Sequence, residues 1–260
     1  MDDLALAQQL ADAAGAAIRP WFRRSFLVET KADFSPVTAA DREAEAAIRR
    51  LLAEYRPDDG VIGEEYGDDR PDAERVWVLD PIDGTRAFIA GRPLFGTLIG
   101  LVVRGDPVLG VIDQCIIGDR WLAGPDHPTT LNGQRVHARR CADLASARIG
   151  TTSPQAFGPA DFARFEAVRS HAADTLYGGD CHNYGLVAAG HLDAVIEAGL
   201  KLHDWAALVP IVTGAGGVMT DWRGGPLRQG NDDGSQHGGG RVIAAGDAAL
   251  AAAIAAQLIA

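Results

Sequence analysis

The sequence predicts an α/β fold in which sheets and helices stack in layers. Candidate helices and strands alternate irregularly along the chain, and antiparallel hairpins interrupt the alternation. A doubly wound nucleotide-binding domain or an eight-fold barrel would need regular strand–helix repeats, and the chain contains no internal repeat. Its 260 residues suffice for a large core, in one large domain or two smaller ones.

Two helices and a set of short strands are expected in the first half of the chain. Apolar residues recur at helical spacing over 3–24, and a second helix is predicted over 39–56. The expected strands are 61–62, 76–80, 98–103, 108–112 and 120–123. A turn at Gly105-Asp106-Pro107 makes two of these strands an antiparallel pair, and Asn132-Gly133 is typical of a hairpin turn.

A weak boundary near 139–146 divides the chain into a half spanning 1–142 and a half spanning 143–260. In the second half the sequence predicts helices over 159–171, 180–190, 204–214 and 247–260, and strands over 148–151, 192–196, 218–222 and 242–245. Residues 223–240 are rich in Gly, Asp and Asn and are predicted to form a mobile loop.

Composition and charge narrow the class of protein. Hydrophobic residues at 47% and charged residues at 23% are typical of a globular enzyme. The net charge of −11 argues against binding to nucleic acid or to an anionic membrane. The three cysteines lack metal-site spacing, and no signal peptide or membrane-spanning run is found, so we expect reduced thiols in a cytoplasmic protein.

The most informative stretch is an apolar run that ends in Asp80-Pro81-Ile82-Asp83-Gly84-Thr85. The strand end fixes Asp80, and the proline after it stiffens the turn, so that Asp83 and the Ile82 carbonyl can face the same point. Such hard oxygen ligands suit Mg²⁺ or Mn²⁺. Gly84 and Thr85 open the next helix, where free N–H groups favour an anion such as phosphate. The stretch therefore predicts metal-assisted phosphoryl transfer to water.

Four further acidic residues accompany this stretch, and each has a structural alternative. Glu64 and Glu65 follow an apolar strand, where a solvated turn is equally typical. Asp204 opens a predicted helix and could simply be its N-cap. Asp41 completes Thr38-Ala39-Ala40-Asp41, which fits a capping box, whereas the functional interpretation has its carboxylate orienting a water.

Taken together, these motifs resemble the inositol monophosphatase superfamily of Mg²⁺-dependent, lithium-sensitive phosphatases. The matching segments are Gly63-Glu64-Glu65, Asp80-Pro81-Ile82-Asp83-Gly84-Thr85, Asp204, and Lys31 followed by Val37-Thr38-Ala39-Ala40-Asp41. The resemblance covers nearly the whole chain. It implies a five-layered αβαβα sandwich of the inositol monophosphatase and fructose-1,6-bisphosphatase type. The active site would lie between the halves, with most metal ligands in 1–142 and with Asp204 and the specificity residues in 143–260. A homodimer is expected because such phosphatases are commonly homodimers.

The resemblance also implies a ligand set. Glu64, Asp80 and the Ile82 carbonyl would hold one Mg²⁺, and Asp80, Asp83 and Asp204 a second. The site would hold two or three Mg²⁺, with Mn²⁺ as a possible substitute. Two bound metal ions polarise the phosphate and stabilise the leaving oxygen.

The resemblance implies catalytic roles for Asp41, Glu65 and Thr85. Thr85 would orient the attacking water, supported by Asp41, and Glu65 would orient ligands or water from behind. Backbone N–H groups of Gly84 and Thr85 would bind the phosphate oxygens. Catalysis would then consist of positioning and electrostatics, without a covalent enzyme intermediate.

A narrower resemblance is to the histidinol-phosphatase branch. It rests on the segments 93–98, 177–190, 195–201 and 206–211. Inositol phosphatases typically carry a small apolar residue in place of Asp180, and a Trp before the last metal aspartate. Histidinol phosphatases usually read Lys-Pro-Tyr-Asp at that place, where this chain reads Lys201-Leu202-His203-Asp204. The departure keeps the metal ligand and removes an aromatic side chain near the substrate entrance.

Asp180 and Glu197 are the expected substrate-recognition residues, because a carboxylate pairs well with the ammonium or imidazole of histidinol phosphate. Asn183 lies one helical turn from Asp180 and is expected on the same wall. The predicted function is a histidinol-phosphate phosphatase that yields L-histidinol in histidine biosynthesis. The alternatives are phosphatases for inositol-1-phosphate, fructose-1,6-bisphosphate or adenosine 3′,5′-bisphosphate, and a non-catalytic phosphate- or metal-binding regulator.

Overall fold

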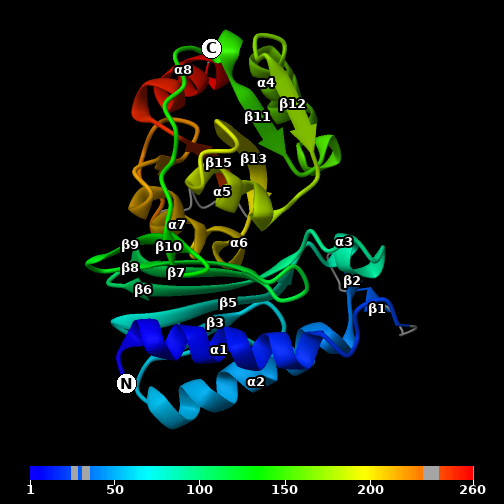
Figure 1. Ribbon diagram of the computed structural model, residues 1–260, viewed down its shortest axis with the longest axis vertical. Helices are drawn as coiled ribbons and strands as arrows, with labels where there is room; N and C mark the ends of the chain where they lie inside the picture. The colour runs from blue at the N-terminus through cyan, green and yellow to red at the C-terminus, as the bar shows by residue number, and fades with distance from the viewer. Residues whose placement is uncertain (25–28, 31–35, 231–239, 260) are drawn as a thin grey trace.

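Five layers stack in the order helix, sheet, helix, sheet, helix in a computed structural model that describes residues 1–24, 29–30, 36–230 and 240–259 (Figure 1). An eight-stranded sheet and a five-stranded sheet form the second and fourth layers. The N-terminus and the last helix lie at opposite ends of the stack (Figure 1). This arrangement confirms the layered α/β sandwich expected from the sequence.

Helices α1 (Asp3–Ile18) and α2 (Ala39–Tyr55) form the first layer. Their buried faces pack against one side of the eight-stranded sheet in a core that includes Trp77 and Leu79. The prediction that the first helix extends to residue 24 is wrong. Helix α1 ends at Ile18 because Pro20 has no N–H to donate to the Ala16 carbonyl.

The eight-stranded sheet has the order β10-β9-β8-β7-β6-β5-β3-β4. Its strands are β3 (Gly60–Gly63), β4 (Gly67–Asp69), β5 (Arg75–Asp83), β6 (Gly96–Val103), β7 (Asp106–Gln114), β8 (Asp119–Gly124), β9 (His127–Leu131) and β10 (Gln134–Arg135). Neighbours are antiparallel except β3 and β5. Along β5, Val76 and Val78 face the core between the sheets, whereas Trp77 and Leu79 face α1 and α2. Both faces are buried, which explains the continuous apolar run.

The middle layer consists of α5 (Cys181–Ala188), α6 (Leu202–Trp205) and α7 (Leu208–Gly214), which lie between the two sheets (Figure 1). The prediction of one helix over 204–214 is wrong. Pro210 cannot donate to the Ala206 carbonyl, and the chain breaks into two helices at 206–207. The break packs tightly on the sheet, since a Cβ on Gly110 would lie 1.9 Å from the Ala207 carbonyl oxygen.

The five-stranded sheet has the order β12-β11-β13-β15-β14, and α4 (Pro159–Arg169) and α8 (Ala248–Leu258) cover its outer face. Its strands are β11 (Arg148–Thr151), β12 (Asp174–Tyr177), β13 (Ala194–Leu200), β14 (Val218–Thr220) and β15 (Gly240–Ala245). Strand β12 was not expected from the sequence. It is an edge strand whose Leu176 and Tyr177 are both exposed, so it lacks the apolar run of a buried strand.

Smaller elements complete the chain: helix α3 (Thr85–Ile89), the ribbon of β1 (Glu29–Thr30) and β2 (Pro36–Val37), and 3₁₀ turns at Leu144–Ser146 and Pro154–Ala156. Half of the loop expected over 223–240, namely residues 231–239, lies outside the described residues. The two sheets come from separate segments, yet Val78 and Val195 belong to one shared core between them. The division into halves at residue 142 stays a prediction.

Candidate active site

The end of β5 carries the first part of the candidate site. Asp80 is 2% exposed, and its Oδ1 accepts a hydrogen bond from the Ile82 N–H at 3.1 Å. The strand is irregular between Asp80 and Asp83, where its register with β6 shifts. Thr85 Oγ1 donates to the Ile82 carbonyl at 3.1 Å. The predicted turn therefore has a defined geometry that ties Thr85 to the expected ligand carbonyl.

Gly84 links this turn to the loop before α5. Its φ of 89° lies in the left-handed region, which suits glycine, and it precedes the first residue of α3. A Cβ at Gly84 would lie 3.0 Å from Asp180 Oδ2. The backbone conformation therefore favours glycine, and a larger residue would also press on the Asp180 carboxylate.

Asp204 completes the cluster from the middle layer. It is the third residue of α6 rather than its N-cap, and its Oδ2 accepts the Lys201 N–H at 2.6 Å. His203 Nε2 lies 3.5 Å from Asp204 Oδ1. Ligand oxygens of Asp80, Asp83 and Asp204 all lie within 4.8 Å of one another. The structure therefore brings together three of the predicted metal-binding side chains.

The electrostatics of this cluster fit a bound divalent cation. Burial, followed by the charge of Glu64 and of the other two aspartates, raises the pKa of Asp80 well above its usual range. Burial and the charges of Asp180 and Asp204 do the same for the pKa of Asp83. Carboxylates crowded in this way repel one another unless a cation balances them. Their hard oxygens match the ligands that Mg²⁺ and Mn²⁺ take.

Glu64 and Glu65 lie in the turn between β3 and β4. The Glu64 N–H donates to the Leu79 carbonyl at 3.2 Å, next to Asp80. The charge of Glu64 raises the pKa values of Asp80 and Asp41, which places its carboxylate near the cluster. The hydrogen bond and charge of Glu29 raise the pKa of Arg42, and the charge of Glu65 adds a smaller contribution. The role expected for Glu65 stays a prediction.

Asp41 forms the predicted capping box, and its role in orienting a water stays a prediction. Its Oδ2 accepts hydrogen bonds from the Thr38 N–H at 2.9 Å and from Thr38 Oγ1 at 2.6 Å, which forms the capping box. Its Oδ1 is buried and has no hydrogen-bond partner among the described residues. Burial is the first cause of its raised pKa. A buried oxygen of this kind calls for a water or ligand, as the functional interpretation requires.

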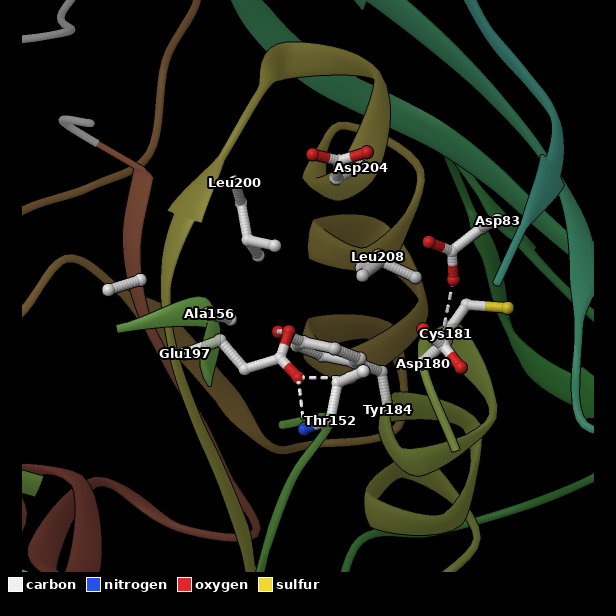
Figure 2. A pocket seen from close by; sticks show the side chains of 11 residues that line it. Asp83, Thr152, Ala156, Asp180, Cys181, Tyr184, Glu197, Leu200, Asp204 and Leu208 are labelled. Carbon is white, nitrogen blue, oxygen red and sulfur yellow. Dashed lines mark hydrogen bonds between the residues drawn. The ribbon is translucent and has the colours of Figure 1, made fainter. Parts of the chain in front are cut away.

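A cavity of about 160 Å³ opens beside the cluster (Figure 2). Its lining residues include four acids and no basic residue among those the structure describes; they are Asp83, Thr152, Ala156, Asp180, Cys181, Tyr184, Glu197, Ala198, Leu200, Asp204 and Leu208. The cavity joins the aspartate cluster to the two residues expected to recognise substrate.

Asp180 occupies a constrained position on the cavity wall. Its φ of 46° and ψ of −134° follow two glycines that also have positive φ. Burial, then the charges of Glu197 and Asp204, raises the pKa of Asp180 to about 7. Asn183 supports this loop from behind, because its Nδ2 donates to the Gly178 carbonyl at 2.9 Å. Asn183 is therefore not among the side chains that line the cavity, contrary to expectation.

Glu197 lies at the far end of the cavity with both oxygens held. Its Oε1 accepts from the Thr152 N–H at 2.8 Å and from Thr152 Oγ1 at 2.5 Å, and its Oε2 accepts from the Tyr184 hydroxyl at 2.9 Å (Figure 2). Sequence reasoning missed Thr152 and Tyr184, because no local pattern relates them to Glu197. It also missed the buried Glu45 of α2, although Asp41 and Glu45 sit at helical spacing.

The fold and this site define a layered α/β enzyme with a candidate divalent-metal centre beside a small acidic cavity. A family model described as "Inositol monophosphatase family" matches residues 2–259, so the chain belongs to the inositol monophosphatase family. Its class is therefore phosphomonoester hydrolase, and enzymes of this family are metal-dependent. None of the helices that the structure describes is long and apolar enough to cross a membrane.

Individual relatives carry different names. The chain is 51% identical to an inositol monophosphatase of known structure from Zymomonas mobilis, with a TM-score of 0.90 over 100% of this chain and 98% of that one. It is 46% identical over 222 residues to "Bifunctional phosphatase IMPL2, chloroplastic" of Arabidopsis thaliana, which covers 85% of this chain but only 64% of the plant protein. A histidinol-phosphatase of Streptomyces coelicolor is 39% identical over 245 residues, 87% of this chain and 90% of that protein.

Proposed function

We propose that this chain is a Mg²⁺-dependent phosphatase that hydrolyses histidinol phosphate to L-histidinol and phosphate. The observation that carries the proposal is the acidic cavity. Asp180 and Glu197 lie beyond the aspartate cluster, in a cavity with no basic residue among its described lining residues. A substrate that brings its own ammonium or imidazolium would supply the missing positive charge. The histidinol-phosphatases among the relatives support this choice.

The ligands proposed are Glu64, Asp80, Asp83, Asp204 and the Ile82 carbonyl. Bound there, Mg²⁺ supplies positive charge to the phosphate and the leaving oxygen and makes water more acidic. The backbone N–H groups of Gly84 and Thr85, at the start of α3, are proposed to bind the phosphate oxygens.

Thr85 and Asp41 are proposed to orient the attacking water. Because the Thr85 hydroxyl already donates to the Ile82 carbonyl, its oxygen is left to accept a hydrogen bond from that water. Asp41 Oδ1, which has no hydrogen-bond partner among the described residues, can accept a second hydrogen bond from a water at the base of the cluster. The proton of the attacking water would then be directed away from the phosphorus before the bond forms.

Inositol-1-phosphate is the second candidate substrate. The relative named inositol monophosphatase is 51% identical to this chain over its full length, which favours a polyol phosphate. Ring hydroxyls could donate to Glu197, as they could in either kind of enzyme. Asp180 should distinguish the two candidate substrates. The neutral ring of inositol-1-phosphate gains less binding energy from a second carboxylate on the cavity wall than a cationic group does.

A substrate panel tests the proposal. Phosphate release with Mg²⁺ would be measured on L-histidinol phosphate, inositol-1-phosphate, fructose-1,6-bisphosphate and adenosine 3′,5′-bisphosphate, with the chelated enzyme as control. We expect kcat/KM for histidinol phosphate to exceed the others by about 100-fold, or about 2.7 kcal/mol of transition-state discrimination. A preference for inositol-1-phosphate would overturn the substrate assignment but leave the proposed metal site unaffected. No release from any substrate would favour a non-catalytic regulator.

Several finer expectations belong to the same proposal. Two or three Mg²⁺ per site, inhibition by lithium and a homodimer are proposed on resemblance. The cytoplasmic location is proposed from the cysteine pattern, and the two halves at 1–142 and 143–260 from the boundary near 139–146. A small-molecule substrate follows from family membership itself.

A further inference from the structure

We infer that Glu45 and Arg49 of α2 are positioning residues that hold the Glu64 turn in the geometry needed to bind metal. The inference rests on the proposed role of Glu64 as a ligand. It concerns a buried ion pair that the proposed mechanism does not otherwise use.

Glu45 is fully buried, and its carboxylate is directed at the turn between β3 and β4. Its Oε2 accepts the Glu65 N–H at 2.8 Å, and its Oε1 accepts the Tyr66 N–H at 3.2 Å. Arg49 Nε donates to the same Oε1 at 2.7 Å, and Arg49 also donates to the Gly67 carbonyl. One ion pair therefore holds three consecutive residues that follow Glu64.

Gly63 makes this approach possible. A Cβ at Gly63 would lie 2.0 Å from Glu45 Oε1 and 2.6 Å from an Arg49 nitrogen, so any side chain there would displace the Glu45–Arg49 ion pair. The chain thus has a glycine directly before Glu64 because the Glu45 carboxylate occupies the space of a side chain. The glycine in the Gly63-Glu64-Glu65 motif belongs to this contact rather than to a solvated turn.

The opposite side of the turn is held by β5. Gly63 pairs with Leu79 in the parallel register of β3 and β5, and the Glu64 N–H continues that ladder to the Leu79 carbonyl. Glu64 is therefore fixed on one side by the strand that carries Asp80, and on the other by Glu45. Restraint from both sides limits where its carboxylate can go, which is the usual effect of groups that orient metal ligands.

A matched ion pair separates positioning from general stability. Asp113 and Arg120, on β7 and β8, pair at 2.7 Å with side-chain exposures of 6% and 21%, against 0% and 22% for Glu45 and Arg49. Neither Asp113 nor Arg120 lines the cavity or belongs to the aspartate cluster. Asp113→Asn therefore removes the charge of a similarly buried ion-pair partner without touching the Glu64 turn.

The experiment measures Mn²⁺ affinity by paramagnetic resonance and amide exchange of residues 63–67 in the metal-free protein. In Glu45→Gln an amide nitrogen must face either the Arg49 or the Glu65 donor, so at least one contact is lost. We expect its Mn²⁺ affinity to fall about 10–100-fold, with faster exchange at Glu65 and Tyr66. Arg49→Lys, which keeps the charge, should show a smaller loss of the same kind, and Asp113→Asn less than a twofold change.

The outcomes distinguish this inference from the proposed function. If the unaltered protein binds Mn²⁺ and Glu45→Gln binds it equally well, the pair is structural and the inference is overturned. Equal losses in Glu45→Gln and Asp113→Asn would overturn it as well. If the unaltered protein binds no Mn²⁺, the proposed metal site fails, and with it the inference.

Discussion

The buried carboxylates at the two ends of the cavity differ in the number of hydrogen bonds that they accept. At the metal end, Asp80, Asp83 and Asp204 each have one oxygen anchored by a single backbone N–H, from Ile82, Cys181 and Lys201. At the far end, Glu197 accepts three hydrogen bonds, from Thr152 and Tyr184.

The two ends therefore differ in what their carboxylates can still bind. One neutral N–H fixes the position of a carboxylate but does not neutralise its charge, and a cation bound among the three neighbouring aspartates would balance those charges. Three donors nearly saturate Glu197, which leaves room on Oε2 for about one more hydrogen bond. The metal end is thus suited to binding a cation, and the far end to accepting one hydrogen bond from the substrate.

Removal of a charge at the metal end should have the largest effect on activity. In Asp83→Asn the side-chain oxygen can still accept the Cys181 N–H, so the fold should change little. We expect kcat/KM for phosphate release to fall about 1,000-fold, or about 4 kcal/mol, with a nearly unchanged Tm. Asp58→Asn, on an exposed turn, is the control. Retention of more than about a tenth of the activity would refute the proposed ligand set.

The next largest effect on kcat/KM is expected from a substitution of Asp180 on the cavity wall. Asp180→Asn removes the charge and replaces one L-residue by another of nearly the same size, so the backbone at φ 46° and ψ −134° meets the same steric demand in both proteins. We expect about a 10–30-fold loss of kcat/KM on histidinol phosphate and less than about 3-fold on inositol-1-phosphate, since a charge-assisted hydrogen bond contributes about 1.5–3 kcal/mol. Equal losses of kcat/KM on both substrates would show that Asp180 does not bind the ammonium or imidazole group.

At the far end, removal of one donor should affect binding rather than chemistry. Tyr184→Phe deletes the hydroxyl that donates to Glu197 Oε2 and keeps the ring in the core. We expect a loss of about 1–3 kcal/mol in the free energy of unfolding, measured by urea denaturation, and a several-fold rise in KM. A large fall in kcat with constant KM would contradict this, because it would place Tyr184 at the reacting groups.

Local patterns were enough to predict the elements whose causes lie within a few residues. The Thr38–Asp41 capping box, the turn after Asp80 and the hairpin at Asn132-Gly133 all appear as expected. The break before Leu208 was missed, although Pro210 was visible, because a single proline near a helix start is often tolerated.

Contacts between distant segments could not be predicted from pattern alone. Tyr184 comes from α5 and Thr152 follows β11, yet they meet on Glu197 of β13. Glu45 reaches a turn about twenty residues away in sequence. In each case the stacking of the layers determines which residues meet, and a single sequence carries no record of that stacking.

The smallest expected effect is the pH dependence of stability in the metal-free protein. Burial and the charges of Glu197 and Asp204 raise the pKa of Asp180 to about 7, whereas an unfolded aspartate titrates near 4. Between these values the folded state binds more protons, so the free energy of unfolding falls as pH rises from about 4 to about 7. The aspartates of the metal end, whose pKa values are also raised, act in the same direction.

Stability should therefore be lost on the alkaline side, and Mg²⁺ should restore it by balancing the same charges. We expect the Tm of the chelated protein to fall by several degrees between pH 5 and pH 8, since about 1 kcal/mol shifts Tm by roughly 2–4 °C in a chain of this size. Asp180→Asn should flatten part of that slope, and saturating Mg²⁺ most of it. If Mg²⁺ leaves the slope unchanged while Asp180→Asn removes it, the charge that destabilises the protein lies on the cavity wall, and the contrast between the two ends is wrong.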